Sequence, residues 1–161
     1  MTDRQAILEL LENGNIPYKL ISHPAVFTID EMAQLNLPQS DVVAKNLFVR
    51  DDKKRNYYLI SVQEEKRVDL KALREKIAAR PLSFASEQDL NAMLGLQKGA
   101  VTPFGVLNDR DCKVKVLIDT AFCDGLIGVH PNENTATIWV KTTDLIHIIR
   151  QHGHEVEWVA L

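Results

Sequence analysis

The sequence predicts an α+β fold: a single domain in which a mixed, mainly antiparallel sheet is covered by helices. Strand-like and helical segments are mixed without the regular strand–helix–strand alternation of a parallel sheet. Several neighbouring strands are separated by short polar turns, which is typical of antiparallel hairpins. The length of 161 residues and the hydrophobic content of 45% suit one core, so we expect one domain over residues 1–161.

The N-terminal third begins with two helices and a strand between them. Residues 3–13 carry an apolar stripe of isoleucine and leucine after a residue that can cap a helix, and Asn-Gly-Asn follows. A short strand is expected over 18–21. Thr28 stands three residues before Glu31, the spacing of a capping box, and predicts a helix over 28–35.

The remaining elements follow from period-two and helical patterns and from their flanking breakers. Residues 95–105 contain two glycines and a proline and are expected to form a loop. Helices are expected over 69–79, after the capping residue Ser86, and over 144–152. Strands are expected over 42–50, 57–62, 83–85, 113–118, 125–129, 135–140 and 156–159.

Composition excludes several classes of function. The formal net charge of −3 gives no global basic surface, so we expect no tight DNA binding. No apolar run approaches the roughly 20 residues that span a bilayer, and the N-terminus has no secretory pattern. Cys112 and Cys123 show no metal spacing and are expected to be reduced thiols. We therefore expect a cytoplasmic protein without membrane contact.

Lys45 is the first candidate site residue, because it is a charge on an apolar strand. In VVAKNLFV, residues 42–49, alternate positions share a face, so Lys45 and Asn46 lie on opposite faces. A buried unpaired charge costs several kcal/mol, so Lys45 needs a partner or a water-filled cleft. One reading is an edge lysine or an ion pair with Asp109 or Asp119. The other is a cleft lysine that binds a phosphate or a carboxylate.

A loop containing glycine and proline is the second candidate. GAVTPFGVLND, residues 99–109, has two glycines and a proline within seven residues, which predicts an irregular backbone. Such a loop can present backbone N–H groups to an oxyanion or a carbonyl oxygen. A plain connecting loop is the alternative.

The third candidate is a histidine at the end of a strand. In GVHPNENTATIWV, residues 128–140, the asparagine and glutamate residues are ordinary turn formers, but the turn does not require His130 or Pro131. His147, His152 and His154 lie near a helix C-terminus, where histidine is electrostatically favoured. No cysteine or carboxylate completes a recognisable spacing with them, so we expect no metal site.

Together these segments resemble a known family. AKNLFV, LSFAS, GAVTPFGVLND and IGVHPNENTATI occur in the order found in the YbaK/prolyl-tRNA synthetase editing-domain superfamily, the free-standing aminoacyl-tRNA deacylases. The resemblance runs from the strand near Ile16 to the helix at Asp144. It is strongest to the ProX branch, because the cysteine-specific branch has a glycine-rich turn in place of His-Pro-Asn.

The resemblance implies a role for each candidate residue. Lys45 is expected near the phosphate of the terminal nucleotide, and His130 and Pro131 beside the amino-acid pocket. Asn46 follows Lys45 in this branch and is included as a substrate-binding residue. His130 is expected at the mouth of a cleft, opposite Lys45 and the loop. The backbone that fixes the aminoacyl carbonyl is expected to comprise Gly99, Ala100, Val101, Thr102 and Pro103.

The activity implied by the resemblance is trans-editing, the hydrolysis of alanine from mischarged proline tRNA. The expected partners are the tRNA acceptor end and, transiently, prolyl-tRNA synthetase; no cofactor is expected. No Ser/His/Asp or Cys/His arrangement appears, so no covalent intermediate is predicted. Three alternatives remain open: removal of cysteine or serine instead, a non-catalytic module that binds a nucleotide or an aminoacyl group, and a regulator that senses amino acids.

Overall fold

The computed structural model describes residues 2–161, so residue 1 of the expected domain lies outside the described residues. The helices are α1 (Arg4–Asn13), α2 (Ile29–Gln34), α3 (Leu70–Lys76), α4 (Glu87–Leu94) and α5 (Thr142–His152). The strands are β1 (Tyr18–Ser22), β2 (Ala44–Asp51), β3 (Tyr57–Gln63), β4 (Leu82–Phe84), β5 (Val114–Asp119), β6 (Leu126–Val129), β7 (Ala136–Lys141) and β8 (Val156–Val159). None of the helices in this range is long and apolar enough to cross a bilayer.

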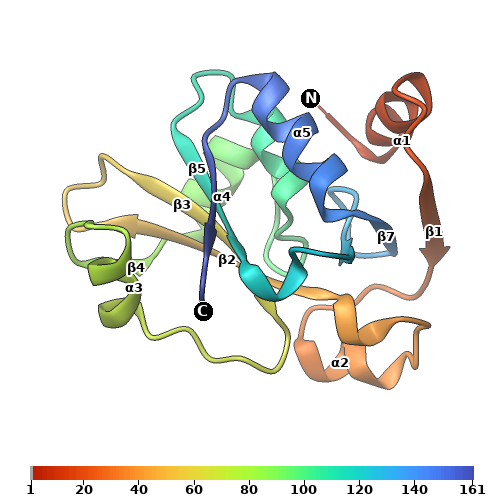
Figure 1. Ribbon diagram of the computed structural model, residues 1–161, viewed down its shortest axis with the longest axis horizontal. Coiled ribbons are helices and arrows are strands. Elements are labelled where there is room, and N and C mark those ends of the chain that lie inside the picture. Colours follow the sequence, from red (N-terminus) through yellow and green to blue (C-terminus); the bar gives the residue numbers. More distant parts are fainter. Residues whose placement is uncertain (1) are drawn as a thin grey trace.

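The strands form two sheets rather than the one sheet that the sequence predicts. The larger sheet has the order β4-β2-β3-β5-β8, with antiparallel pairs on either side of β2 and parallel pairs on either side of β5. The smaller sheet, β1-β7-β6, is antiparallel throughout. Both sheets and the helices around them are visible in Figure 1. The predicted class, α+β with mixed and mainly antiparallel pairing, is confirmed.

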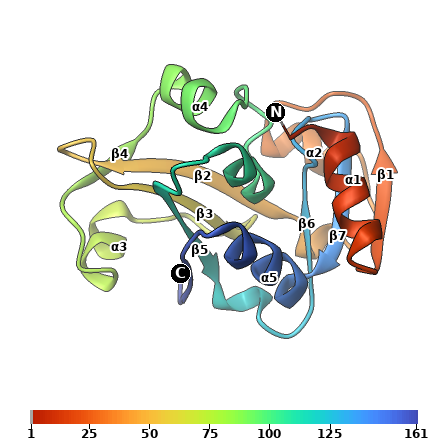
Figure 2. The ribbon, with the colours of Figure 1, turned by 90° about the horizontal axis from the view of Figure 1, so that it is seen from above.

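The five-stranded sheet buries both of its faces. Phe48, Leu59 and Val116 belong to the main core, which includes the buried residues of α1, α4 and α5. Their neighbours along the strands, such as Ile60 and Leu117, form a second cluster that includes Leu73 of α3. This is the alternation that strand geometry imposes. Figure 2 shows α3 and α4 on opposite sides of the β2–β3 hairpin.

A glycine joins the two sheets. Gly128 of β6 forms an isolated parallel bridge to Val43, the residue before β2. The indole of Trp139, which pairs with Gly128 across the β6–β7 ladder, also lies against this glycine. Trp139 and Val43 are buried with Met32 of α2 in a third apolar cluster. The close approach of three chain segments therefore depends on a residue without a side chain.

Helix boundaries mostly follow the predicted capping residues, with four differences. The helix expected over 144–152 begins two residues earlier, at Thr142, without a side-chain cap. Thr28 accepts a hydrogen bond from the Glu31 N–H as predicted, but the Glu31 carboxylate accepts from Phe27 instead of completing the box at Thr28. The helix expected over 69–79 ends at Lys76, since Ala78 adopts a left-handed φ of 53°. Part of the expected loop 95–105 is helical, because Pro103–Asn108 forms a 3-10 helix that Thr102 caps.

The junction between the sheets predicts that alanine substitutions at Gly128 and at Gly125 have different effects on stability. In Gly128→Ala the new Cβ would lie 2.9 Å from Trp139 Nε1 and 3.0 Å from Val43 Cγ2. We expect a loss of about 1–3 kcal/mol in the free energy of unfolding, because overpacking displaces well-packed neighbours. Gly125→Ala is the control, since no atom lies within 4 Å of its new Cβ. Chemical denaturation measures both, and equal stability of the two variants would contradict this account of the junction.

Candidate functional site

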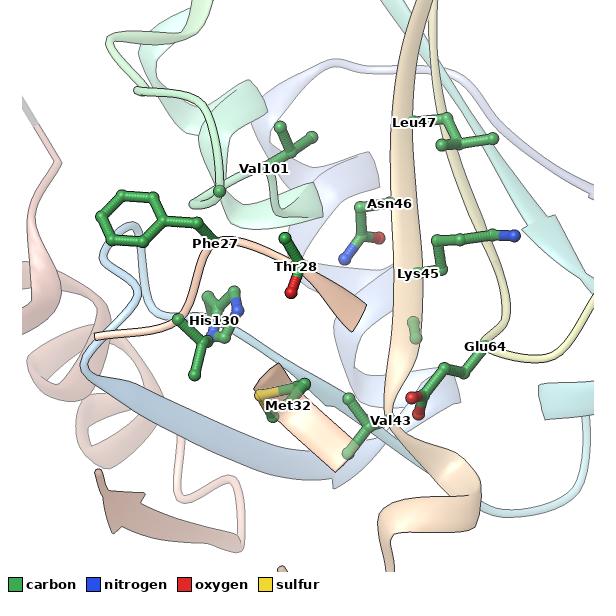
Figure 3. Close-up of a pocket in the computed structure, with 13 residues that line it drawn as sticks. Phe27, Thr28, Met32, Val43, Lys45, Asn46, Leu47, Glu64, Val101 and His130 are labelled. Atoms are coloured by element: carbon green, nitrogen blue, oxygen red, sulfur yellow. The ribbon is translucent and has the colours of Figure 1, made fainter. Parts of the chain in front are cut away.

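A cleft of about 290 Å³ lies along β2 and contains most of the candidate residues. Figure 3 shows its lining side chains. The residues that line it are 26–28, Met32, 43–47, Glu64, Gly99, Val101 and His130. They belong to β2 and the turn before it, to α2 and the segment before it, to the start of the Gly99 loop, and to the positions directly after β3 and β6.

Incomplete pairing of β2 explains the position of the cleft. One edge of β2 pairs with β3 from Ala44 to Arg50. The other edge pairs with β4 only from Val49 to Asp51. Among residues 2–161, no strand pairs with this second edge at positions 45–47. The cleft follows that open edge, so side chains of both faces of β2 border it.

Asn46 points into the space between β2 and His130 (Figure 3). Its Oδ1 accepts a hydrogen bond of 2.6 Å from Ser61 Oγ, on the paired strand β3. Ser61 is fully buried, so this bond fixes the orientation of the amide. The Nδ2 group makes no hydrogen bond to any residue in the described part of the chain, and it can therefore donate to an oxygen of a bound molecule.

Lys45 points to the opposite side of β2 from Asn46 (Figure 3), which differs from the expected position of its amine opposite His130. Its Nζ donates to the backbone carbonyl of Lys66. Burial, followed by the nearby positive charge of Arg67, lowers the pKa of Lys45. The aliphatic part of Lys45 borders the cleft, while its charge lies beside the segment that follows β3.

Neither ion pair considered for Lys45 forms. Asp119 is paired with Lys66 at 2.9 Å, and Asp109 contacts His154 at 3.2 Å. Among the described residues that line the cleft, the only acid is Glu64, whose pKa is raised by burial and by the charge of Glu65. The charges near this end of the cleft are therefore those of Lys45, the exposed Arg67 and Glu64.

His130 is held as a neutral base. Its Nδ1 lies 2.8 Å from the carbonyl oxygen of Ala136, which can only accept, so Nδ1 carries the proton. Burial lowers the pKa of His130 despite that hydrogen bond. Within residues 2–161 the sole buried side-chain N or O atom without a partner is Asn132 Oδ1. The unpaired Nε2 of His130 is therefore accessible and can accept a hydrogen bond from a molecule in the cleft.

Thr102 attaches the glycine–proline loop to the histidine turn. Its hydroxyl donates to the backbone carbonyl of His130 at 2.5 Å and accepts from the N–H of Phe104. Gly99 has a φ of +88°, and a Cβ there would lie 2.9 Å from the ring of Phe27. These contacts bring the loop to one side of the cleft, with the segment before α2 against it.

Only part of the predicted loop backbone is free to bind a ligand. The Ala100 N–H donates to Gln97, and Pro103 has no N–H. Gly99 and Val101 line the cleft, and their N–H groups have no partner within the described range. Of the predicted set, the structure brings together Lys45, Asn46, Gly99, Val101 and His130. Those that are buried and do not line the cleft are Ala100, Thr102, Pro103 and Pro131.

Sequence reasoning missed the residues that close the other side of the cleft. Val26, Phe27, Thr28 and Met32 come from α2 and the segment before it, and Glu64 from the end of β3. Phe27 is 59% exposed beside the cleft, which is unusual for a large apolar residue. The capping signal at Thr28 marked this helix, but no sequence pattern showed that it packs across the open edge of β2.

Comparisons with known proteins agree in both sequence and fold. The family model described as an aminoacyl-tRNA editing domain matches residues 23–148. The prolyl-tRNA editing protein ProX of Acetoanaerobium sticklandii is 41% identical over 100% of this chain and 99% of its own. Prolyl-tRNA synthetase associated domain-containing protein 1 of Danio rerio is 33% identical over 94% of this chain and 83% of its own.

Solved structures share the fold at lower identity. A crystal structure described as that of a candidate trans-editing enzyme for prolyl tRNA synthetase has a TM-score of 0.72 and 20% identity. That similarity covers 98% of this chain and 96% of the other. At this level of identity the likeness concerns the fold alone.

The hydroxyl of Thr102 predicts a measurable effect on stability. Thr102→Val removes the donor to the His130 carbonyl and leaves that oxygen without its partner. We expect the free energy of unfolding to fall by about 1–3 kcal/mol, the usual cost of an unsatisfied buried group. Thr102→Ser keeps the hydroxyl and should lose less. Denaturant titration of the two variants measures the difference, and a valine variant as stable as the serine variant would refute the role of the hydroxyl.

Proposed function

The chain belongs to the family of aminoacyl-tRNA editing domains, and from that membership we propose that it hydrolyses alanine from mischarged proline tRNA. The reaction cleaves the ester between the amino acid and the 3′-terminal ribose. The observation that carries the proposal is the cleft, where Asn46, His130 and the start of the Gly99 loop meet at the open edge of β2. Residues 1–161 are proposed to act as one editing domain.

The cleft supplies hydrogen-bond donors for the ester carbonyl. Water attacks the carbonyl carbon, and negative charge develops on the oxygen. In this proposal, the N–H groups of Gly99 and Val101 and the amide of Asn46 stabilise that charge. Each preorganised donor of this kind is worth about 3–4 kcal/mol in hydrolases where one has been removed. The Ser61 hydrogen bond keeps the Asn46 amide in the donating orientation.

Water, rather than a protein nucleophile, is the attacking group. Among the described residues that line the cleft, Thr28 has the only hydroxyl side chain, and none is a cysteine. The Thr28 oxygen already accepts from the Glu31 N–H, and no base lies in hydrogen-bond contact with it within the described residues. We propose that the adjacent ribose hydroxyl of the substrate positions the water, with neutral His130 accepting a hydrogen bond through Nε2.

Lys45 is proposed to bind the phosphate of the terminal nucleotide. Its charge lies on the far side of β2 from Asn46, so the substrate crosses the open edge of the strand. The aminoacyl group then lies on the His130 side and the phosphate on the Lys45 side. The exposed guanidinium of Arg67 adds positive charge at the same end.

The apolar wall of the cleft provides selection by size. The apolar side chains of Val26, Met32 and Val43 line the cleft. Excluding alanine from a synthetase site by missing methylene groups is worth only about 1–3 kcal/mol, so a second, smaller site is required. We propose that this site admits a methyl side chain and rejects the proline ring.

Recognition of the tRNA body is proposed to need help from another protein. The formal net charge of −3 provides little long-range attraction for an acceptor stem. A transient complex with prolyl-tRNA synthetase would deliver the mischarged end directly to the cleft. A cytoplasmic location, where tRNA is charged, fits this proposal.

Deacylation of alanine-charged proline tRNA tests the function directly. The native protein should release alanine rapidly and leave proline-charged tRNA intact. Lys45→Ala should lower kcat/KM at least about tenfold, because a hydrogen bond to a charged group is worth about 1.5–3 kcal/mol. Lys19→Ala is the matched control, since Lys19 is an exposed lysine on β1 outside the cleft.

Each substrate gives a distinct outcome. Release of cysteine instead of alanine would keep the chemistry and overturn the choice of substrate based on His130. Release of serine would extend the proposed substrates from alanine to another small amino acid. Release of none of these amino acids by a folded protein would sink the proposal and favour a binding module without turnover.

The pH dependence tests the neutral form of His130. Because burial lowers its pKa below the ordinary 6.5, His130 should remain neutral at pH 7 and become protonated only below that value. Protonation removes the Nε2 acceptor, so log kcat/KM should be flat near neutrality and fall on the acid side. In His130→Gln, which cannot titrate, the acid limb should disappear while the overall rate falls. An unchanged acid limb in that variant would assign it to another group.

A further inference from the structure

Three potential metal ligands that are distant in sequence meet at the C-terminal end of α5. The nearest ligand atoms of Cys112, His152 and His154 all lie within 4.8 Å of one another. The Nδ1 atoms of the two histidines are 3.2 Å apart, and their rings are stacked with centroids separated by 5.0 Å. None of the three residues lines the editing cleft. This cluster is therefore separate from the cleft of the proposed reaction.

The second histidine is oriented by a buried carboxylate. His154 Nε2 lies 3.2 Å from Asp109 Oδ2, and both side chains are buried, with exposed fractions of 0% and 6%. Since the carboxylate accepts, the single ring proton belongs on Nε2, and Nδ1 presents its lone pair to the cluster. A histidine that donates one ring N–H to a carboxylate and offers the other nitrogen outward is typical of metal sites.

The spacing of the two nitrogens suits a tetrahedral ion. Two nitrogens bound at about 2.05 Å with tetrahedral angles lie about 3.3 Å apart, close to the observed 3.2 Å. A thiolate and a nitrogen in the same geometry lie about 3.6 Å apart, so Cys112 has to turn inward on binding. Its Sγ now lies 3.6 Å from the backbone carbonyl of His152, and Cys112 is only half-buried.

Gly153 permits the approach of the thiol. It terminates α5 with a φ of +110°, and a Cβ at this position would lie 3.1 Å from Cys112 Sγ. The same turn allows histidines two residues apart to stack on one side of the chain. The His-Gly-His segment and Cys112 thus form one surface-accessible cluster with soft and borderline ligands.

We propose that Cys112, His152 and His154 bind a Zn²⁺ ion, with Asp109 orienting His154. Sulfur and imidazole ligands are those that Zn²⁺ prefers, and three protein ligands leave the fourth position to water. Binding removes the thiol proton, because the thiolate is the ligand. The ion would tie the turn before β5 to the junction between α5 and β8. Its role is to stabilise the C-terminal part of the fold, independent of the editing reaction.

A titration with Co²⁺ on the metal-free full-length protein tests this site. Co²⁺ bound through Cys112 should produce a thiolate-to-cobalt charge-transfer band, and Zn²⁺ should displace it. Cys112→Ser should abolish the band, and His152→Gln should weaken binding at least about tenfold, the lower limit for loss even of an outer-shell partner. Both residues are partly or fully exposed, so these variants should fold.

Matched controls are available on the same surface. Cys123→Ser removes the other cysteine, which is exposed, and His147→Gln removes an exposed histidine of α5 that is outside the cluster. Both should bind Co²⁺ with native affinity and show the native band. Zn²⁺ should also raise the Tm of the native protein and not that of Cys112→Ser. Absence of the thiolate band, or an equal loss of Co²⁺ affinity in the cluster and control variants, would overturn the proposal. The two histidines would then be only a hydrogen-bonded pair.

Discussion

Contact between Gly128 and Val43 brings the smaller sheet against the start of β2, and the rest of the site depends on it. The smaller sheet meets the chain at Val43, one residue before β2, and contributes no partner to the next few residues. The strand β4 begins to pair only at Val49. Between Val43 and Val49, the backbone N–H and C=O groups on this edge of β2 face the cleft instead of a neighbouring strand. The cleft is therefore a consequence of sheet topology, and the side chains around it give that space its chemistry.

Two fixed hydrogen bonds then set what each side chain can offer. The buried hydroxyl of Ser61 donates a hydrogen bond to Oδ1 of Asn46, which leaves Nδ2 of Asn46 available as a donor. The Ala136 carbonyl accepts a hydrogen bond from Nδ1 of His130, which leaves Nε2 available as an acceptor. Because donor and acceptor are assigned before a substrate enters, little reorganisation is needed during the reaction. Thr102 adds a hydrogen bond that links the glycine–proline loop to the histidine turn.

Local signals in the sequence predicted most elements, and five of the nine candidate residues line the cleft. Capping residues such as Thr28, Ser86 and Asp69 begin helices where expected, because a cap acts within one turn. The split into two sheets was not predictable, since it depends on pairing between distant strands. For the same reason the sequence placed Lys45 opposite His130, although the alternation along β2 was correct. Cys112 is 40 residues from His152, and no spacing rule joins them.

The placement of Lys45 and Asn46 on opposite faces of β2 restricts which insertions and deletions this strand tolerates. Neighbouring residues of one strand face the two ends of the cleft, so their order depends on the count of residues after the Val43 bridge. Substitution at either position alters one end and leaves the other intact. Inserting or deleting a single residue there would exchange the two faces and invert the polarity of the whole cleft. The length of this short segment is thus as restricted as its chemistry.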